Sequence, residues 1–404
     1  MSQPLSTSRA DVVIAGGGVA ALEALIALHE LAPGRVRAML VAPEPDFVYR
    51  PLSVTEPFCL GHATRYPLAE VARDFDAELV RGALAEVDAP GHTVTLGDGS
   101  TLNYESLLVA VGARSHSVFA HAITFGAEGA PEALSGLLAD LEEGYARRVA
   151  FVVPSSATWS LPLYELAIIT ARHVWGAGID DAQFTFVTPE AAPLELFGPE
   201  GSRVVAGLLA NEGIEFVGSA SPDVVHNGVE VHVDGRRIDV DRTVTLPVPE
   251  GPRIAGLPVN AEGFVGVDEH GAVQGLEGVY AAGDATAFPI KQGGLAAQQA
   301  VAAAEAIAAR HGADLDPQPY RPILRGMLLT GGQNRWMRGP AGGTPASTQA
   351  SDHALWWPPT KIATRYLAPY LLGLDDAAYL RSPVPHAHPI ERDLELLASQ
   401  QRGR

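Results

Sequence analysis

The sequence predicts an α/β protein built on strand–turn–helix units. Residues 11–32, residues 149–167 and residues 275–312 each begin with a short apolar strand that runs into a turn and then a helix. Strands that alternate with helices in this way are typical of the α/β class. The 404 residues are also enough for two or three domains with their own cores.

The first unit has a glycine-rich turn. A strand over Val12–Ala15 leads into the turn, which reads Gly16-Gly17-Gly18-Val19-Ala20-Ala21, and an amphipathic helix follows. This order fits the G-x-G-x-x-G/A pattern of dinucleotide-binding units. Gly16 permits the tight turn. Gly18 lets a pyrophosphate approach the helix N-terminus, where free N–H groups and the helix dipole favour an anion.

The second strand of this unit ends near one acidic side chain. Ala42 stands where such units often carry the acid that binds a ribose hydroxyl, and Glu44 follows two residues later. Two interpretations stay open. Glu44 reaches the ribose oxygens, or it is a solvated loop charge.

The third segment supplies polar groups at a strand end. A strand over Val279–Ala282 ends in Gly283-Asp284, and a helix of small residues starts after Lys291-Gln292-Gly293-Gly294. The Asp284 carboxylate can accept hydrogen bonds from a sugar-like chain such as ribityl. The helix start at Gly293 offers N–H groups to the pyrimidine end of a flavin, where reduction places negative charge. The apolar run in residues 107–115 predicts a further buried strand, which ends in a turn at Gly112.

Together these segments resemble flavoproteins with two dinucleotide-binding domains. Within that group the chain is most similar to the branch of sulfide:quinone oxidoreductases and flavocytochrome c sulfide dehydrogenases, with type II NADH dehydrogenases as relatives. The resemblance implies two Rossmann-like domains, the second inserted in the first. It places an FAD-binding domain at residues 1–115 and 259–320, a degenerate NAD(P)-type domain at 116–258, and a C-terminal α+β capping or interface region at 321–404.

The resemblance also assigns cofactor positions. Gly16, Gly18, Gly112, Asp284 and Lys291 match residues that contact FAD in the family, and the neighbouring Val19, Ala20, Gly283 and Gly293 belong to the same motifs. Residues 46–53, "DFVYRPLS", match the loop beside the isoalloxazine, which places Tyr49, Arg50 and Pro51 there.

The second unit lacks the glycines of a phosphate-binding turn. Its turn reads Pro154-Ser155-Ser156-Ala157 before a Tyr-Glu pair, as in the sulfide-oxidising relatives. Those relatives use two cysteines over the flavin, and Ser160 and Thr286 occupy the corresponding positions here. Neither can form a persulfide or a thiolate adduct. Hydroxyls and N–H groups of the turn could still hold a phosphate, but Pro154 removes one donor.

The function expected on this basis is an FAD-dependent oxidoreductase. It would pass electrons from an unidentified small-molecule donor to an acceptor such as a quinone, without a cysteine pair. Lys291, Ser160, Thr286, Tyr49 and Arg50 are the expected pocket residues. The alternatives are an NAD(P)H dehydrogenase with an atypical nucleotide turn, and a flavin-binding electron-transfer or sensor protein without its own substrate.

The C-terminal region predicts two strands around a Gly-Gly turn within residues 320–339. A short helical segment follows, with Ile362, Tyr366, Leu367, Tyr370 and Leu371 on one side. We expect this segment to be a lid on its own domain or a homodimer contact. A peripheral membrane contact is the alternative, less favoured because Lys361 and Arg365 are its only basic residues.

Composition narrows the choice of function. The net charge of −19 argues against nucleic acid as a partner. No apolar stretch approaches the roughly 20 residues of a membrane span, and the polar N-terminus lacks a signal region, so a cytoplasmic location is expected. Cys59, the only cysteine, excludes a disulfide within the chain and is expected to be a small buried hydrophobe. The histidines, including His386 and His388, show no metal-ligand spacing.

Overall fold

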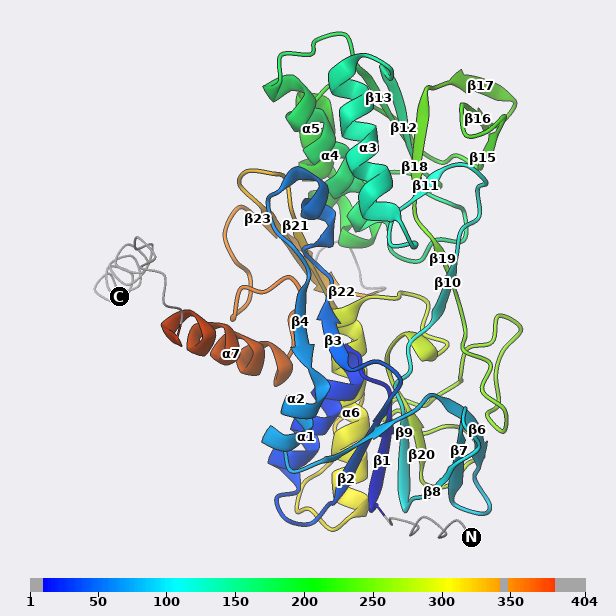
Figure 1. Ribbon diagram of the computed structural model, residues 1–404, viewed down its shortest axis with the longest axis vertical. Coiled ribbons are helices and arrows are strands. Elements are labelled where there is room, and N and C mark those ends of the chain that lie inside the picture. The colour runs from blue at the N-terminus through cyan, green and yellow to red at the C-terminus, as the bar shows by residue number, and fades with distance from the viewer. Residues whose placement is uncertain (1–9, 342–347, 382–404) are drawn as a thin grey trace.

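Two parallel five-stranded sheets form the framework of the protein (Figure 1). The computed structural model describes residues 10–341 and 348–381. In the first sheet the strands follow the order β20 (Val279–Ala281), β9 (Ser106–Val109), β1 (Val12–Ala15), β2 (Ala38–Ala42) and β5 (Glu78–Arg81). Its edge strand β20 pairs with β9 in parallel, so segments from two distant parts of the chain complete one sheet.

Helices cover one face of the first sheet and a small antiparallel sheet covers the other. Val12 and Ile14 of β1 pack toward helices α1 (Val19–Leu31) and α6 (Gly293–Arg310), which lie side by side. Val13 points the opposite way, as the alternation along a strand requires. It packs toward the sheet of β6 (Leu84–Asp88), β7 (Thr93–Leu96) and β8 (Thr101–Asn103). The first strand and the helix of residues 11–32 are confirmed.

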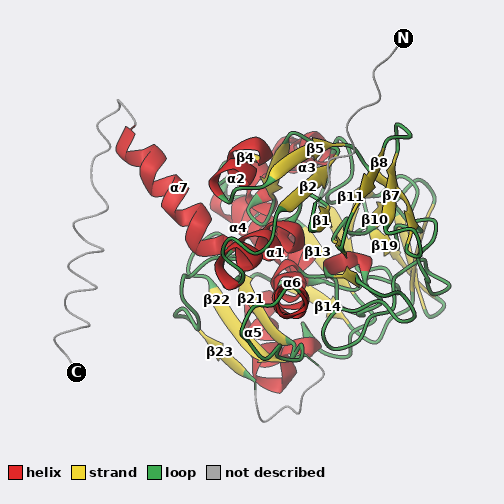
Figure 2. Cartoon of the chain, turned by 90° about the horizontal axis from the view of Figure 1, so that it is seen from below, coloured by secondary structure: helices red, strands yellow, loops and turns green. Residues whose placement is uncertain are grey.

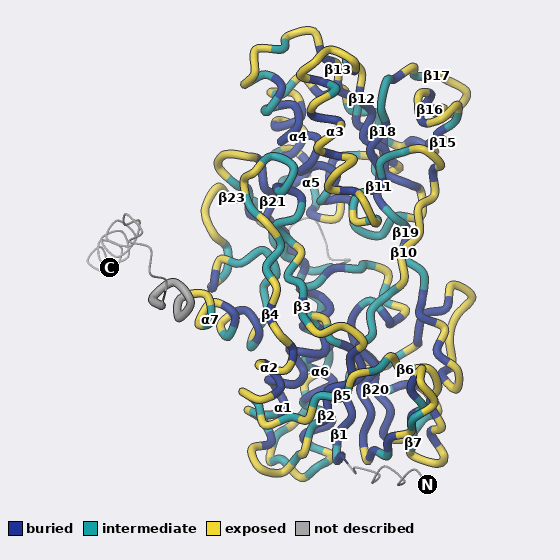
Figure 3. Tube along the Cα trace, in the orientation of Figure 1, coloured by how far each residue is buried: buried dark blue, intermediate teal, exposed yellow. Residues whose placement is uncertain are grey.

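The second sheet repeats this arrangement. Its strand order is β11 (Ile123–Thr124), β18 (Arg242–Thr245), β12 (Arg148–Val152), β13 (Gln183–Val187) and β14 (Ile214–Val217), and all neighbours are parallel. The helices beside it are α3 (Ala130–Glu143), α4 (Leu161–Gly176) and α5 (Gly198–Asn211). The short apolar strand predicted at the start of residues 149–167 and the helix after it are therefore confirmed. Figure 3 shows that the central strands of both sheets are buried.

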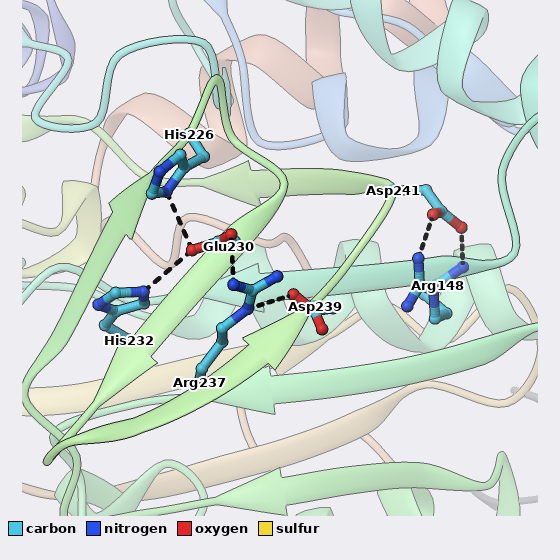
Figure 4. A network of polar contacts seen from close by, with 7 residues as sticks. All are labelled: Arg148, His226, Glu230, His232, Arg237, Asp239 and Asp241. Atoms are coloured by element: carbon cyan, nitrogen blue, oxygen red, sulfur yellow. Dashed lines mark hydrogen bonds and ion pairs between the residues drawn. The ribbon is translucent and has the colours of Figure 1, made fainter.

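A small antiparallel sheet lies beside the second framework sheet and carries a cluster of charged side chains. It contains β15 (Pro222–Val225), β16 (Glu230–Val233) and β17 (Arg236–Asp239). The Glu230 carboxylate is 2.9 Å from Arg237 Nη1 and 2.9 Å from His226 Nδ1 (Figure 4). Nearby, Asp241 accepts a hydrogen bond of 2.8 Å from Arg148 and so joins the start of β18 to β12 (Figure 4).

The chain crosses between the two large sheets twice, through β10 (Arg114–His116) and back through β19 (Val248–Glu250). These two segments pair with each other as antiparallel strands. The remaining short elements are β3 (Asp46–Tyr49), β4 (Thr64–Pro67), α2 (Leu68–Asp74) and the 3₁₀ helices η1 (Ser53–Phe58), η2 (Glu195–Phe197) and η3 (Gly283–Ala285).

Cys59 differs from the expectation. It is exposed, not buried, because it ends η1 in the left-handed conformation with a φ of 55° and turns toward solvent.

The C-terminal region contains β21 (Ile323–Leu328), β22 (Arg335–Pro340), β23 (Gln349–Ser351) and α7 (Leu367–Arg381). The two predicted strands are confirmed as the antiparallel pair β21–β22. The predicted helix start is wrong, because α7 begins at Leu367 and Ile362 precedes it. The buried carboxylate of Glu23 on α1 accepts the N–H groups of Arg365 and Leu367 and so holds the chain at this point. From there α7 projects away from the body of the protein (Figure 2).

His386 and His388 lie outside the described residues. Among residues 10–341 and 348–381, no helix has both the length and the apolar character needed to cross a bilayer.

Candidate functional site

The turn between β1 and α1 is shaped by its glycines. Gly16 has a φ of +134°, and a Cβ there would lie 2.2 Å from the Ala110 carbonyl oxygen, so only glycine fits. Gly18 precedes α1, and a Cβ there would have no heavy atom within 4 Å. Gly16 therefore serves the close packing of the turn, whereas Gly18 leaves open space in front of the helix N-terminus.

A cavity of about 800 Å³ extends from this turn. Eight of the residues predicted to contact the cofactor or the substrate line it, namely Gly16, Gly18, Val19, Glu44, Tyr49, Arg50, Pro51 and Gly112. Ile362 from the C-terminal segment also lines it, and the Ile362 N–H donates a hydrogen bond of 3.2 Å to the Tyr49 hydroxyl oxygen. The segment before α7 thus forms part of the cavity wall beside the 46–53 loop.

Ala20 and Gly283 support the cavity from behind. Ala20 is buried and does not line the cavity. Gly283 has a φ of +77°, and a Cβ there would lie 3.0 Å from the Ala20 Cβ. Both residues therefore allow η3 to pack closely against the start of α1.

Asp284, next to Gly283, is a partly buried carboxylate. Burial raises its pKa, and the charge of Lys291 is the one described group that opposes this shift. No described residue donates a hydrogen bond that offsets the cost of burying it. A carboxylate in this state is suited to accept hydrogen bonds from the hydroxyls of a bound molecule.

Lys291 lies beside this carboxylate. Its ammonium group donates hydrogen bonds to the Thr286 carbonyl and, at 2.8 Å, to the Phe288 carbonyl, and it lies 3.7 Å from the centre of the Phe264 ring. Burial lowers the pKa of Lys291 to about 8, while Asp284 opposes this shift. The side chain is therefore a cation held at a fixed position.

A smaller cavity of about 170 Å³ adjoins the first at Arg50, Pro51, Phe125 and Ile362, which line both. Lys291 and Gly293 line this second cavity, together with Lys361. The Lys361 ammonium lies 2.5 Å from the carboxylate of Glu165, which is fully buried on α4. Burial lowers the pKa of Lys361 and raises that of Glu165, and the attraction within the pair opposes both shifts.

A third cavity of about 220 Å³ connects this region with α7. Tyr49 lines both this cavity and the largest one, and Lys361 lines both this cavity and the second one. Most of its other lining residues are apolar, among them Leu52, Met327, Ala368, Leu371 and Leu372.

Ser160 and Thr286 are not brought to these cavities. The Thr286 side chain is fully buried, and its hydroxyl donates a hydrogen bond of 2.9 Å to the Gly283 carbonyl. The Ser160 hydroxyl donates a hydrogen bond of 3.1 Å to Glu190. Both hydroxyls have partners inside the protein and so do not face a ligand, contrary to the expectation that they shape the pocket.

Glu190 was not identified from the sequence. It also accepts hydrogen bonds from the Tyr164 hydroxyl at 2.8 Å and the Thr188 hydroxyl at 3.2 Å. The Tyr164 ring is fully buried and stacks on Phe186 at 4.0 Å. The signal available was the position of Glu190, three residues after the end of β13, where nucleotide-binding units often carry the acid that binds ribose.

The residues of the largest cavity fit FAD. The open space at Gly18 suits the close approach of a pyrophosphate, and the N-terminus of α1 has no acidic residue in its first turn to repel it. Asp284 does not line this cavity, whereas Lys291, whose charge acts on Asp284, and Gly293 line the adjoining 170 Å³ cavity. A flavin that extends from the glycine turn toward the start of α6 would pass from the first cavity into the second.

The comparisons with known proteins agree with this fit. The family model "Pyridine nucleotide-disulphide oxidoreductase" matches residues 10–145 and 164–306. The sulfide-quinone reductase of Aquifex aeolicus is 25% identical over 268 residues, which cover 60% of this chain and 59% of that relative. This chain thus spans about three fifths of that relative's length. The ferredoxin reductase component of a chlorobenzene dioxygenase from Cupriavidus is 27% identical, with 74% and 75% coverage.

Solved structures show the same fold. The sulfide:quinone oxidoreductase of Aquifex aeolicus superimposes with a TM-score of 0.76 at 18% identity and covers 91% of this chain and 90% of its own. A ferredoxin reductase from Rhodopseudomonas palustris reaches 0.61 at 19% identity, with 84% and 87% coverage. Because the family model matches residues 10–145 and 164–306, the chain belongs to the pyridine nucleotide-disulphide oxidoreductase family, a family of oxidoreductases that bind FAD.

Proposed function

We propose that this protein passes electrons from a small-molecule donor other than NAD(P)H, through FAD, to a quinone-type acceptor. The apolar cavity under α7 carries this proposal. It shares Tyr49 with the flavin cavity, and Leu371 and Leu372 of α7 are among its lining residues. An apolar cavity of this kind suits a hydrophobic ring better than it suits a charged nucleotide.

The second sheet supports the exclusion of NAD(P)H. In the turn between β12 and α4, Pro154 has no N–H group that could bind a phosphate. The hydroxyls of Ser160, Tyr164 and Thr188 donate hydrogen bonds to the Glu190 carboxylate. They occupy it within the protein, so it does not face the hydroxyls of an incoming ribose. Burial raises the pKa of Glu190, and the hydrogen bonds from these hydroxyls oppose that shift. An NAD(P)H dehydrogenase with an atypical turn would have to break this network.

Lys291 and Lys361 have different parts in the proposed reaction. FAD, when bound, supplies the two-electron chemistry. Lys291 holds a positive charge beside the helix start of α6, where negative charge is stabilised. Lys361 places a protonated amine on a wall common to the second and third cavities, and a quinone that gains two electrons also gains protons.

We also propose that residues 1–115 with 259–320, residues 116–258 and residues 321–404 form three functional parts. The two chain crossings at β10 and β19 support this division.

The proposal is tested by following the reoxidation of the reduced holoprotein. The protein is reduced with dithionite without excess and mixed anaerobically with menadione in a stopped-flow instrument. Ala368 lines the apolar cavity, so Ala368→Leu should fill part of it and slow flavin reoxidation by menadione about tenfold or more. The exposed Ala69 of α2 provides the matched control, and Ala69→Leu should react like the unmodified protein.

Reoxidation by a second electron acceptor, ferricyanide, distinguishes damage to the flavin from a blocked route for the quinone. Ferricyanide is a small anion that does not need the apolar cavity, so both variants should be reoxidised by it at equal rates. Equal menadione rates for Ala368→Leu and the unmodified protein would disprove the proposed route.

A further inference from the structure

A separate cavity of about 420 Å³ lies between α6 and the C-terminal segment. It shares no lining residue with the 800 Å³ cavity and only Arg325 with the 170 Å³ cavity. Its walls come from α6 at Gln298 and Val301, from residues 318–321, and from residues 363–365. It is thus distinct from the 800 Å³ cavity, and Arg325 stands between it and the 170 Å³ cavity.

Two polar atoms on residues that line this cavity are buried without a partner. They are the Tyr320 hydroxyl and the Arg325 Nε. A buried donor without an acceptor costs roughly 1–3 kcal/mol, so such atoms are uncommon in folded proteins unless something else satisfies them. Both atoms have almost no exposed surface, so a ligand would reach them only after the cavity wall moves.

The charges around the cavity favour an anion. On the β21–β22 pair, Arg325 lies directly opposite Arg338, and like charges in this position repel. The two acidic residues of the cavity are already engaged. Glu23 accepts backbone N–H groups from Arg365 to Leu367, and Glu305 lies 3.5 Å from Arg365 and accepts the Gln318 N–H. Arg325 has no acidic partner among the described residues, and desolvation together with the charge of Arg338 lowers its pKa.

Aromatic side chains form the outer wall. The Trp356 indole N–H donates a hydrogen bond of 2.9 Å to the Thr360 carbonyl, and the ring packs edge-on against Trp336 at 4.6 Å. This arrangement fixes the position of the Trp356 ring. Its neighbour Trp357 is 78% exposed, which is unusual for the largest side chain. Both indoles line the cavity and offer flat surfaces to a ring.

We propose that this cavity binds a planar aromatic carboxylate, whose carboxylate pairs with the Arg325 guanidinium and whose ring contacts Trp356 and Trp357. Arginine suits this role because its planar fork matches the two oxygens of a carboxylate. This site is additional to the proposed electron transfer and does not depend on it.

Isothermal titration calorimetry of the FAD-loaded full chain with 2-naphthoate tests the proposal. We expect 2-naphthoate to bind with a submillimolar Kd and 2-naphthamide, its neutral analogue, to bind at least tenfold more weakly. Arg325→Gln should weaken the binding of 2-naphthoate at least tenfold, since it removes a charge-assisted pair. Arg335→Gln is the matched control, because Arg335 lies on the same hairpin and does not line the cavity.

Two further variants guard against misfolding as an explanation. Tyr320→Phe keeps the ring and removes only the enclosed, unpartnered hydroxyl, so the free protein should be at least as stable as before and 2-naphthoate should bind as tightly. Trp357→Ala changes an exposed residue and should weaken binding severalfold. The proposal is wrong if 2-naphthoate does not bind at millimolar concentration, if the amide binds equally well, or if Arg325→Gln and Arg335→Gln behave alike.

Discussion

Replacing Gly18 with Ala should weaken FAD binding and leave the fold almost unchanged. The backbone φ of −96° at this position is ordinary for alanine, and a Cβ would meet no heavy atom within 4 Å. Alanine is a poorer helix N-cap than glycine, so we expect the free energy of unfolding of the apoprotein to fall by no more than about 1 kcal/mol. The added methyl group would occupy the space in which a pyrophosphate approaches the helix start.

The loss of affinity follows from the contacts that this approach allows. Removing one charge-assisted hydrogen bond costs roughly 1.5–3 kcal/mol, which corresponds to an increase in Kd of roughly 10- to 150-fold. The assay is a titration of apoprotein with FAD, followed by quenching of flavin fluorescence. Urea unfolding of the same apoprotein measures the stability separately.

Two other glycines serve as controls. Gly16→Ala places a Cβ 2.2 Å from the Ala110 carbonyl oxygen, so it should lose stability and FAD binding together. Gly207→Ala, on α5 with open space around its Cβ position, should change neither FAD affinity nor the unfolding transition by more than about 1 kcal/mol. Unchanged FAD affinity in Gly18→Ala would refute the assignment of this turn as the pyrophosphate site.

Three further predictions concern the cofactor, the donor and the stability. The purified protein should be yellow with about one FAD per chain, and Asp284→Ala should weaken FAD binding by roughly 1.5–3 kcal/mol because it removes a carboxylate that accepts hydroxyl groups; FMN in place of FAD, or undiminished affinity, would contradict this. Sulfide should not be oxidised through a persulfide relay, because Cys59 is the only cysteine; robust sulfide-dependent quinone reduction that survives Cys59→Ser would show another route. Asp241→Asn should destabilise the protein by about 1–2 kcal/mol at pH 7, after allowance for solvent screening. Burial acts to raise the Asp241 pKa, but hydrogen bonds from Arg148 and from the backbone of Arg147 and Arg148 lower it to about 2. This contribution is therefore present above 3.8, the ordinary pKa of an aspartate, and is lost as the pH falls toward 2. The difference in Tm between Asp241→Asn and the unmodified protein should shrink over that interval.

Local sequence patterns predicted the framework well. Gly16 and Gly283 mark strand ends and have φ values of +134° and +77°, which few other residues can adopt. The hairpin of β21 and β22 was predicted for a similar reason, from two apolar runs around Gly331-Gly332. In each case the signal lies within about ten residues of the feature that it predicts.

The features that the sequence did not predict depend on contacts between distant residues. Lys361 meets Glu165 across 196 positions, and the start of α7 is set by Glu23, more than 340 residues earlier. Ser160 and Thr286 were expected in the pocket because of their places in two motifs. The partners that turn their hydroxyls inward, Glu190 and the Gly283 carbonyl, follow only from the folded arrangement.

Anaerobic stopped-flow mixing of the oxidised holoprotein with NADH and with NADPH tests the central claim most directly. We infer that the flavin site is intact while the second nucleotide unit is closed by Pro154 and by the hydroxyls bound to Glu190. We therefore predict that flavin reduction is slow and that its rate rises without saturation even at millimolar cofactor. Saturable reduction at micromolar NADH or NADPH would contradict it and would identify the protein as an NAD(P)H dehydrogenase with an atypical turn.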